Sequence, residues 1–102
     1  MKNKDVVLAF LEKREALGSN LYSDGNKLIN YKTTLAQWID NYHLIVNDTW
    51  YSNTSRVNQN YLKKELTPER GIDTYCINGI DKGTEDLTKV YTFTHNIIFN
   101  II

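Results

Sequence analysis

The chain has 102 residues, of which 41% are hydrophobic and 24% are charged, and its 12 basic and 12 acidic side chains cancel to a formal net charge of +0. This composition excludes an intrinsically disordered chain, and the length predicts a single domain over residues 1–102. Without net charge the molecule has no long-range field that would draw it to nucleic acid or to an anionic membrane, and two copies do not repel each other, so a homodimer is allowed.

The first predicted element is a helix over residues 4–17. Asn3 is a favourable N-cap for this helix, and Gly18 is a favourable residue for a left-handed C-terminus. The apolar residues of the segment gather on one broad face, which predicts a helix that packs against a hydrophobic core. We expect a sheet to cover that face.

A run of strands is predicted next. Asp24 and Gly25 lie between two short apolar runs, a pattern that favours a β-hairpin. Alternation of side chains then predicts one extended strand over residues 29–39, with one side buried. A turn at residues 40–41 leads into a further strand over residues 42–47. Together these runs predict an antiparallel meander of three strands.

A second helix is predicted over residues 55–66. Thr54 or Ser55 is suitable as its N-cap, because either hydroxyl can accept a hydrogen bond from the free amides of the first turn. Behind this helix, Pro68 and Gly71 predict a single helical turn that Thr67 caps.

On a helical wheel, the polar residues of the second helix share an arc of about 100°, which we expect to face solvent. Tyr61 and Leu62 lie on the other side and are expected to anchor the helix on the sheet. The polar residues of the arc are Arg56, Gln59, Asn60 and Lys63.

The last third of the chain predicts two more strands, over residues 73–78 and 87–94, with a charged loop before the second one. Residues 96–102 are uncharged and have high β propensity, so we expect a sheet neighbour or a second subunit to cover them. The fold class predicted from these elements is α+β, with two helices packed on an antiparallel sheet of about four to five strands.

Catalytic and metal-binding chemistry has no recognisable signature in the sequence. His43 and His95 are the only histidines, and no Cys/His cluster surrounds them. Cys76 is the single cysteine and is interpreted as a small buried thiol. The acidic residues around Gly83 do not have the spacing of a calcium loop. We therefore expect no catalytic residue, metal site or cofactor, and a protein that is not an enzyme.

The cellular location is predicted from the same features. A lone cysteine excludes an intrachain disulfide and argues against a secreted scaffold. The apolar run over residues 6–11 is too short for a signal peptide, and charged residues follow it. No stretch of the sequence reaches the roughly 20 apolar residues of a membrane span. We expect a protein of the cytoplasm that does not enter a membrane.

The surface over residues 50–64 is the candidate partner-binding site. Its aromatic and Arg-bearing composition favours recognition of a protein. Nucleic acid is the alternative partner, since the cations can contact phosphates, the amides can read base edges and an aromatic ring can stack on a base. The candidate residues are Trp50, Tyr51, Arg56, Gln59, Asn60, Lys63 and Lys64.

Two segments, YKTTLA at residues 31–36 and YSNTSRVNQNYL at residues 51–62, resemble a family of small uncharacterised proteins encoded by phages and other mobile elements of bacteria. That family has a Tyr-x-Thr-x-Ile-Ala strand followed by Tyr-Ser-x-Thr-Thr and Gln-Asn-x-Leu. Leu35 and Ser55 depart from the pattern, in place of Ile and Thr. The matching residues are Tyr31, Thr33, Ala36, Tyr51, Ser52, Thr54, Gln59, Asn60 and Leu62.

The resemblance implies an accessory protein of a mobile element that acts inside the bacterial host cell. The leading hypothesis is a small non-catalytic binding protein that engages a host protein, for example as an anti-CRISPR-like inhibitor of a host defence nuclease. The alternative hypothesis is an accessory nucleic-acid-binding protein that uses the surface over residues 50–64.

Overall fold

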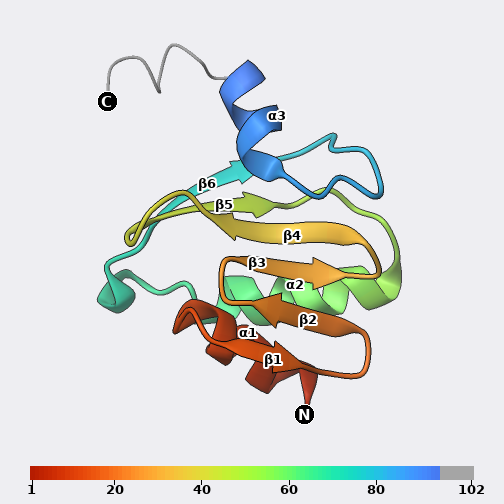
Figure 1. The fold of residues 1–102 in the computed structure, drawn as a ribbon, viewed down its shortest axis with the longest axis vertical. Helices are drawn as coiled ribbons and strands as arrows, with labels where there is room; N and C mark the ends of the chain where they lie inside the picture. The colour runs from red at the N-terminus through yellow and green to blue at the C-terminus, as the bar shows by residue number, and fades with distance from the viewer. Residues whose placement is uncertain (95–102) are drawn as a thin grey trace.

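The computed structural model describes residues 1–94 (Figure 1). Within them the chain forms three α-helices, one short 3-10 helix and one sheet. In chain order the elements are α1 (Asn3–Leu11), β1 (Glu15–Leu17), β2 (Leu21–Asp24), β3 (Lys27–Asn30), β4 (Thr33–Trp38), β5 (His43–Asn47), α2 (Asn53–Glu65), η1 (Pro68–Arg70), β6 (Asp73–Ile77) and α3 (Leu87–Thr94).

The sheet has six strands in the order β1-β2-β3-β4-β5-β6. The first five form an antiparallel meander, and β6 lies parallel to β5 after the chain crosses over through α2. The predicted α+β class is therefore confirmed, with six strands in place of four to five. The three-stranded meander was an underestimate, because β1 and the division of the 29–39 segment were not foreseen.

Helices lie on both faces of the sheet (Figure 1). Leu44 and Val46 of β5 belong to the core under α1 and α2, whereas Ile45 between them packs with Leu87 of α3 on the other face. This alternation is the ordinary period of a strand that is buried on both sides. The two main helices, α1 and α2, thus share one face, and α3 covers β4 and β5 on the opposite face.

The first helix ends at Leu11, so the prediction of a helix over residues 4–17 is wrong beyond that residue. Lys13 adopts a left-handed conformation (φ 59°), and Arg14 N donates to Ala9 O at 2.8 Å. Lys13 N and the Trp38 indole both donate to Phe10 O, which satisfies a carbonyl of the last turn. These bonds form a Schellman-type end, here with lysine in place of the usual glycine.

Asn3 and Gly18 do not cap α1. Asn3 is the first residue of the helix, its side chain bonds to Asn20 and Asn58, and the N-cap position is Lys2, whose side chain makes no capping bond. Gly18 is needed for space: a Cβ there would lie 2.3 Å from Asn3 Oδ1 and 3.2 Å from Leu21 O.

The hairpin predicted at Asp24 and Gly25 is confirmed as the β2–β3 turn. Asp24 Oδ1 accepts from Asn26 N at 2.8 Å and from Lys27 N at 2.7 Å, and Gly25 has φ 92°. β5 is confirmed at His43–Asn47. The turn before it is held in the same way, since Asp40 Oδ1 accepts from two backbone amides.

The single strand predicted over residues 29–39 is wrong, since the segment contains a second hairpin. β3 ends at Asn30 and β4 begins at Thr33. Tyr31 (φ 55°) and Lys32 (φ 106°) form the two-residue turn with positive φ angles that glycine or asparagine usually supply. The side-chain alternation continues through the turn, so the pattern gave no sign of it.

The N-terminus of α2 is capped by Ser52, which corrects the predicted caps Thr54 and Ser55. Ser52 Oγ accepts from Ser55 N at 3.1 Å. η1 confirms the helical turn after α2, and Gly71 follows it with φ 66°. Thr67 holds the N-cap position of η1 without a side-chain capping bond.

The last third contains one strand and one helix. β6, at Asp73–Ile77, confirms the first predicted strand, but residues 87–94 form α3, so the second strand was wrong. Asp86 caps this helix: its Oδ1 accepts from Thr88 N at 3.0 Å and from Thr88 Oγ1. Gln37 Oε1 accepts from Leu87 N at 2.7 Å. The expectation for residues 96–102 lies outside the described residues.

The capping bonds of Asp86 allow the assignment of α3 as a helix to be tested. Asp86→Ala removes the cap of α3 and the bond from Gln37 Nε2, so we expect the free energy of unfolding in urea to fall by about 1–2 kcal/mol. The exposed neighbour Glu85 makes no side-chain hydrogen bond within residues 1–94, and Glu85→Ala is expected to change stability by less than about 0.5 kcal/mol. Equal effects of the two substitutions would contradict the capped helix.

Candidate partner-binding face

The buried side of α2 is mostly polar. Ser55, Asn58, Gln59 and Leu62 are its buried residues, and their spacing of three and four places them on one stripe of the helix. Only Leu62 is apolar. An apolar stripe would hold α2 on the sheet through the burial of apolar surface alone. This polar stripe instead requires matched hydrogen-bond partners on the sheet.

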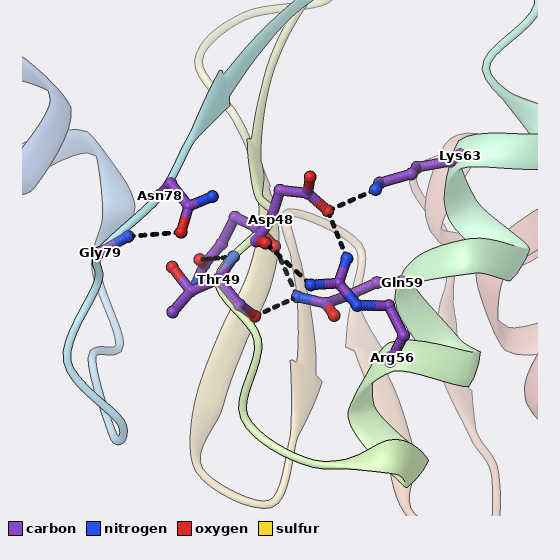
Figure 2. A network of polar contacts seen from close by, with 8 residues as sticks. Asp48, Thr49, Arg56, Gln59, Lys63, Asn78 and Gly79 are labelled. Carbon is purple, nitrogen blue, oxygen red and sulfur yellow. Dashed lines mark hydrogen bonds and ion pairs between the residues drawn. The ribbon is translucent and has the colours of Figure 1, made fainter.

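Gln59 makes the central contact of this stripe (Figure 2). Its side chain is 1% exposed, and Nε2 donates to Asn47 O at 2.9 Å and to Thr49 O at 2.8 Å. Both N–H groups of the amide are therefore used on the end of β5 and on the loop that follows it. The prediction that Gln59 faces solvent is wrong, because the helix turns this amide toward the sheet.

Tyr51 and Asn47 extend the same network. Asn47 Nδ2 donates to Thr34 O at 3.1 Å and to Tyr51 Oη at 2.9 Å, and Tyr51 Oη donates to Ile80 O at 2.7 Å. The phenol group of Tyr51 thus ties the loop after β6 to β5. This candidate residue is half-buried and has a structural role.

The remaining polar residues of the stripe bind the neighbouring elements. Ser55 Oγ donates to Asn30 Oδ1 of β3 at 2.6 Å. Asn58 of α2, Asn20 before β2 and Asn3 of α1 form a triangle of side-chain amides with bonds of 2.7–3.2 Å. The stripe therefore fixes α2 against both the sheet and α1.

Arg56 and Lys63, two predicted contact residues, share one carboxylate (Figure 2). Asp48 Oδ1 lies 2.8 Å from Arg56 Nη1 and 2.5 Å from Lys63 Nζ. Burial disfavours the charged form of Asp48, but the hydrogen bonds from Lys63 and Arg56 outweigh it and hold the pKa of this carboxyl below its ordinary value of 3.8. The three groups together carry a single positive charge.

The outward side of α2 holds the remaining candidates. Asn60 and Lys64 are exposed, and Val57, which the sequence did not single out, is 48% exposed on the same side. Trp50, in the connection before the helix, is 59% exposed. Of the seven candidates, therefore, Trp50, Asn60 and Lys64 are fully available to a partner, and Arg56 and Lys63 are available in part.

A groove between α1 and α2 adjoins this outward side. Its larger hollow, about 440 Å³, and a smaller one of about 100 Å³ share Lys4 and Tyr61. We use the name interhelical groove for the surface formed by Lys2, Lys4, Val57, Tyr61, Lys64 and Glu65.

The lysines of the interhelical groove have no acidic partner in the described part of the chain, because Glu65, which lines the smaller hollow beside Lys4 and Lys64, pairs with Arg70. Within residues 1–94, Lys2, Lys4 and Lys64 form no ion pair. Sequence reasoning missed Lys2 and Lys4 because they lie at the start of the first helix, and only the packing of α1 beside α2 brings Lys4 to the same hollow as Lys64. The long-range amide triangle that sets this packing has no local pattern in the sequence.

The two segments at residues 31–36 and 51–62 meet at the start of α2. Six of their residues line a hollow of about 540 Å³, together with Asn30 and Lys82. Most of the six have internal roles, since Ser52 caps α2 and Thr33 Oγ1 accepts from Gly83 N at 2.8 Å. The six residues are Tyr31, Thr33, Tyr51, Ser52, Thr54 and Ser55.

Comparison of the chain with protein-family models, with curated proteins and with solved structures finds no match. In the described part of the chain, no three His, Cys, Asp or Glu residues are grouped so that they could hold a metal ion. Among the helices of residues 1–94, none combines the length and the apolar character needed to cross a bilayer.

Gln59 and Asn60 provide a direct test of the orientation of α2. Gln59→Ala leaves the buried carbonyl of Asn47 and the partly buried carbonyl of Thr49 without this donor, so we expect the free energy of unfolding to fall by about 2–3 kcal/mol. Asn60→Ala, one position along the helix, is expected to change it by less than about 0.5 kcal/mol. Chemical denaturation measures both, and a reversed order would contradict the buried amide.

The pH dependence of the stability tests the ion pairs of Asp48. Because its pKa is lowered on folding, the stability that it contributes is complete above the unfolded-state value and is lost as the pH falls through the lower folded-state pKa. The stability difference between the wild type and Asp48→Asn should therefore be constant near neutral pH and should shrink below about pH 4. A difference that grows in acid would contradict the ion-pair assignment.

Proposed function

We propose that this chain is a small non-catalytic binding protein of a phage or another bacterial mobile element, which acts in the cytoplasm of the host cell by contact with a host protein. One observation carries the proposal. The interhelical groove holds three lysines, which form no ion pair within residues 1–94, and the exposed apolar side chain of Val57. Groups of this kind are what a recognition surface offers, and the internal packing of the chain does not use them.

The chemistry of the groove favours an acidic segment of the partner protein. Lys2, Lys4 and Lys64 attract carboxylates, and Val57 and Tyr61 offer apolar area to a side chain between them. Charge complementarity of this kind selects a partner and speeds association, while the apolar contact supplies affinity. Trp50 adds an exposed aromatic ring of the kind that is enriched in the centres of interfaces.

Inhibition of a host defence nuclease is the specific form of this function that the resemblance to mobile-element proteins favours. A chain with balanced charge and a basic groove does not imitate the phosphate polymer that a nuclease binds. It is suited instead to an acidic surface element of such an enzyme. Inhibition would then follow from holding that element or from covering the surface beside it.

Accessory binding of nucleic acid is the second candidate function, and the same three lysines favour it. Against it, Gln59 is buried and the charges of Arg56 and Lys63 are shared with Asp48, so few groups remain for phosphates and base edges. Such binding would weaken steeply with salt.

The test of the proposed function is charge reversal in the groove. We expect the wild type to capture a stoichiometric protein partner from a lysate of the bacterial host. The double variant Lys4→Glu/Lys64→Glu is expected to bind it about tenfold more weakly or worse. Lys89→Glu, at an exposed lysine of α3 outside the groove, is the matched control and should bind as the wild type does.

If the wild type and the double variant capture the partner equally well, the interhelical groove is not the binding site. If no protein is captured, and if the wild type but not the double variant shifts DNA or RNA in a gel at low salt, the nucleic-acid function replaces the proposed one. Circular dichroism of each variant confirms that the comparison is made between folded proteins.

A further inference from the structure

Among residues 1–94, β6 forms one edge of the sheet, and the outward backbone groups of Thr74 and Cys76 have no strand partner there. Within residues 1–94 the strand pairs only with β5. Asp73 N donates to Tyr42 O at 2.8 Å, and Ile77 O accepts from Asp48 N at 2.8 Å. Since alternate residues of a strand bond to the same neighbour, the N–H and C=O groups of Thr74 and Cys76 point away from β5.

This edge lacks the features by which sheets ordinarily prevent pairing with another strand. Charged residues, proline, bulges and short length protect edges in natural proteins. The opposite edge, β1, is only three residues long and is preceded by charged residues. β6 has five residues, neither lysine nor proline, and a single charged side chain, Asp73, at its beginning. Thr74 and Cys76 are both exposed, so the interpretation of Cys76 as a buried thiol is wrong.

A second copy of this chain matches the free groups of β6. If two β6 strands lie antiparallel about a two-fold axis through Tyr75, Thr74 of each copy is opposite Cys76 of the other. These two residues are the ones with outward N–H and C=O groups, so each pair exchanges both of its hydrogen bonds. In this register Asp73 faces Ile77, so no like charges meet. The zero net charge also leaves no general repulsion between copies.

We propose that two copies of this chain associate through their β6 edges and form one continuous sheet. The contact is independent of the proposed function. α1, which forms one wall of the interhelical groove, packs on β1, β2 and β3, toward the other edge of the sheet (Figure 1). Each copy of the dimer therefore keeps its groove open, and the dimer presents two such grooves.

Sedimentation velocity of the full chain over a wide range of concentration, with a reductant present, tests the proposal. We expect the sedimentation coefficient of the wild type to rise from the monomer value toward the dimer value. Cys76→Pro removes the outward N–H group and leaves the hydrogen bonds with β5 in place, so this variant should remain monomeric. Cys76→Val keeps the N–H group and removes the thiol, and it should dimerise as the wild type does.

The variant Thr74→Lys is a second test of the dimer, and it does not introduce a proline. It places a charge on the exposed edge, and we expect it to raise the dissociation constant of the dimer by about tenfold or more. The groove variant Lys4→Glu/Lys64→Glu should dimerise normally, so failure of the proposed function is distinguishable from failure of the dimer. A wild type that stays monomeric, or a Thr74→Lys or folded Cys76→Pro variant that dimerises as Cys76→Val does, would overturn the proposal.

Discussion

The side-chain amide of Gln59 donates to the carbonyl groups of Asn47, at the end of β5, and of Thr49 in the loop after it, and the rest of the structure depends on this contact. In a buried site each unpaired carbonyl would cost about 1–3 kcal/mol, so rotation of α2 away from this position is disfavoured. Apolar contacts alone would tolerate such a rotation, because the hydrophobic effect does not depend on the direction of a contact. The polar stripe of α2 thus supplies orientation, and Leu62, 0% exposed, supplies the apolar contact beside it.

Once the orientation of α2 is fixed, the composition of the surface follows from it. Val57, Asn60 and Lys64 are turned outward, and Tyr61 is turned toward α1, where it lines the interhelical groove. Arg56 and Lys63 are turned to the other flank, where Asp48 partly neutralises them. The amide triangle of Asn3, Asn20 and Asn58 then sets the position of α1. The internal polar contacts therefore decide which cations remain for a partner.

Sequence patterns predicted the elements whose determinants are local. The Asp24 and Gly25 turn, β5 and the turn around Pro68 each depend on a few neighbouring residues, and each is present. The predictions that are wrong concern elements that depend on contacts between residues far apart in the sequence. Trp38 meets the last turn of α1 from 28 positions away, and Gln37 meets the start of α3 from 50 positions away. Gln59 was assigned to the surface because polarity usually indicates exposure. No periodicity reveals that a sheet offers carbonyl groups to an amide.

Exchange of side-chain amide protons, followed by NMR, tests the orientation of α2 most directly. The two Nε2 protons of Gln59 are both hydrogen-bonded in the interior, whereas the amide of Asn60 is exposed on the next position of the helix. We expect the Gln59 protons to exchange with solvent far more slowly than those of Asn60. Equal, rapid exchange of the two amides would contradict this orientation.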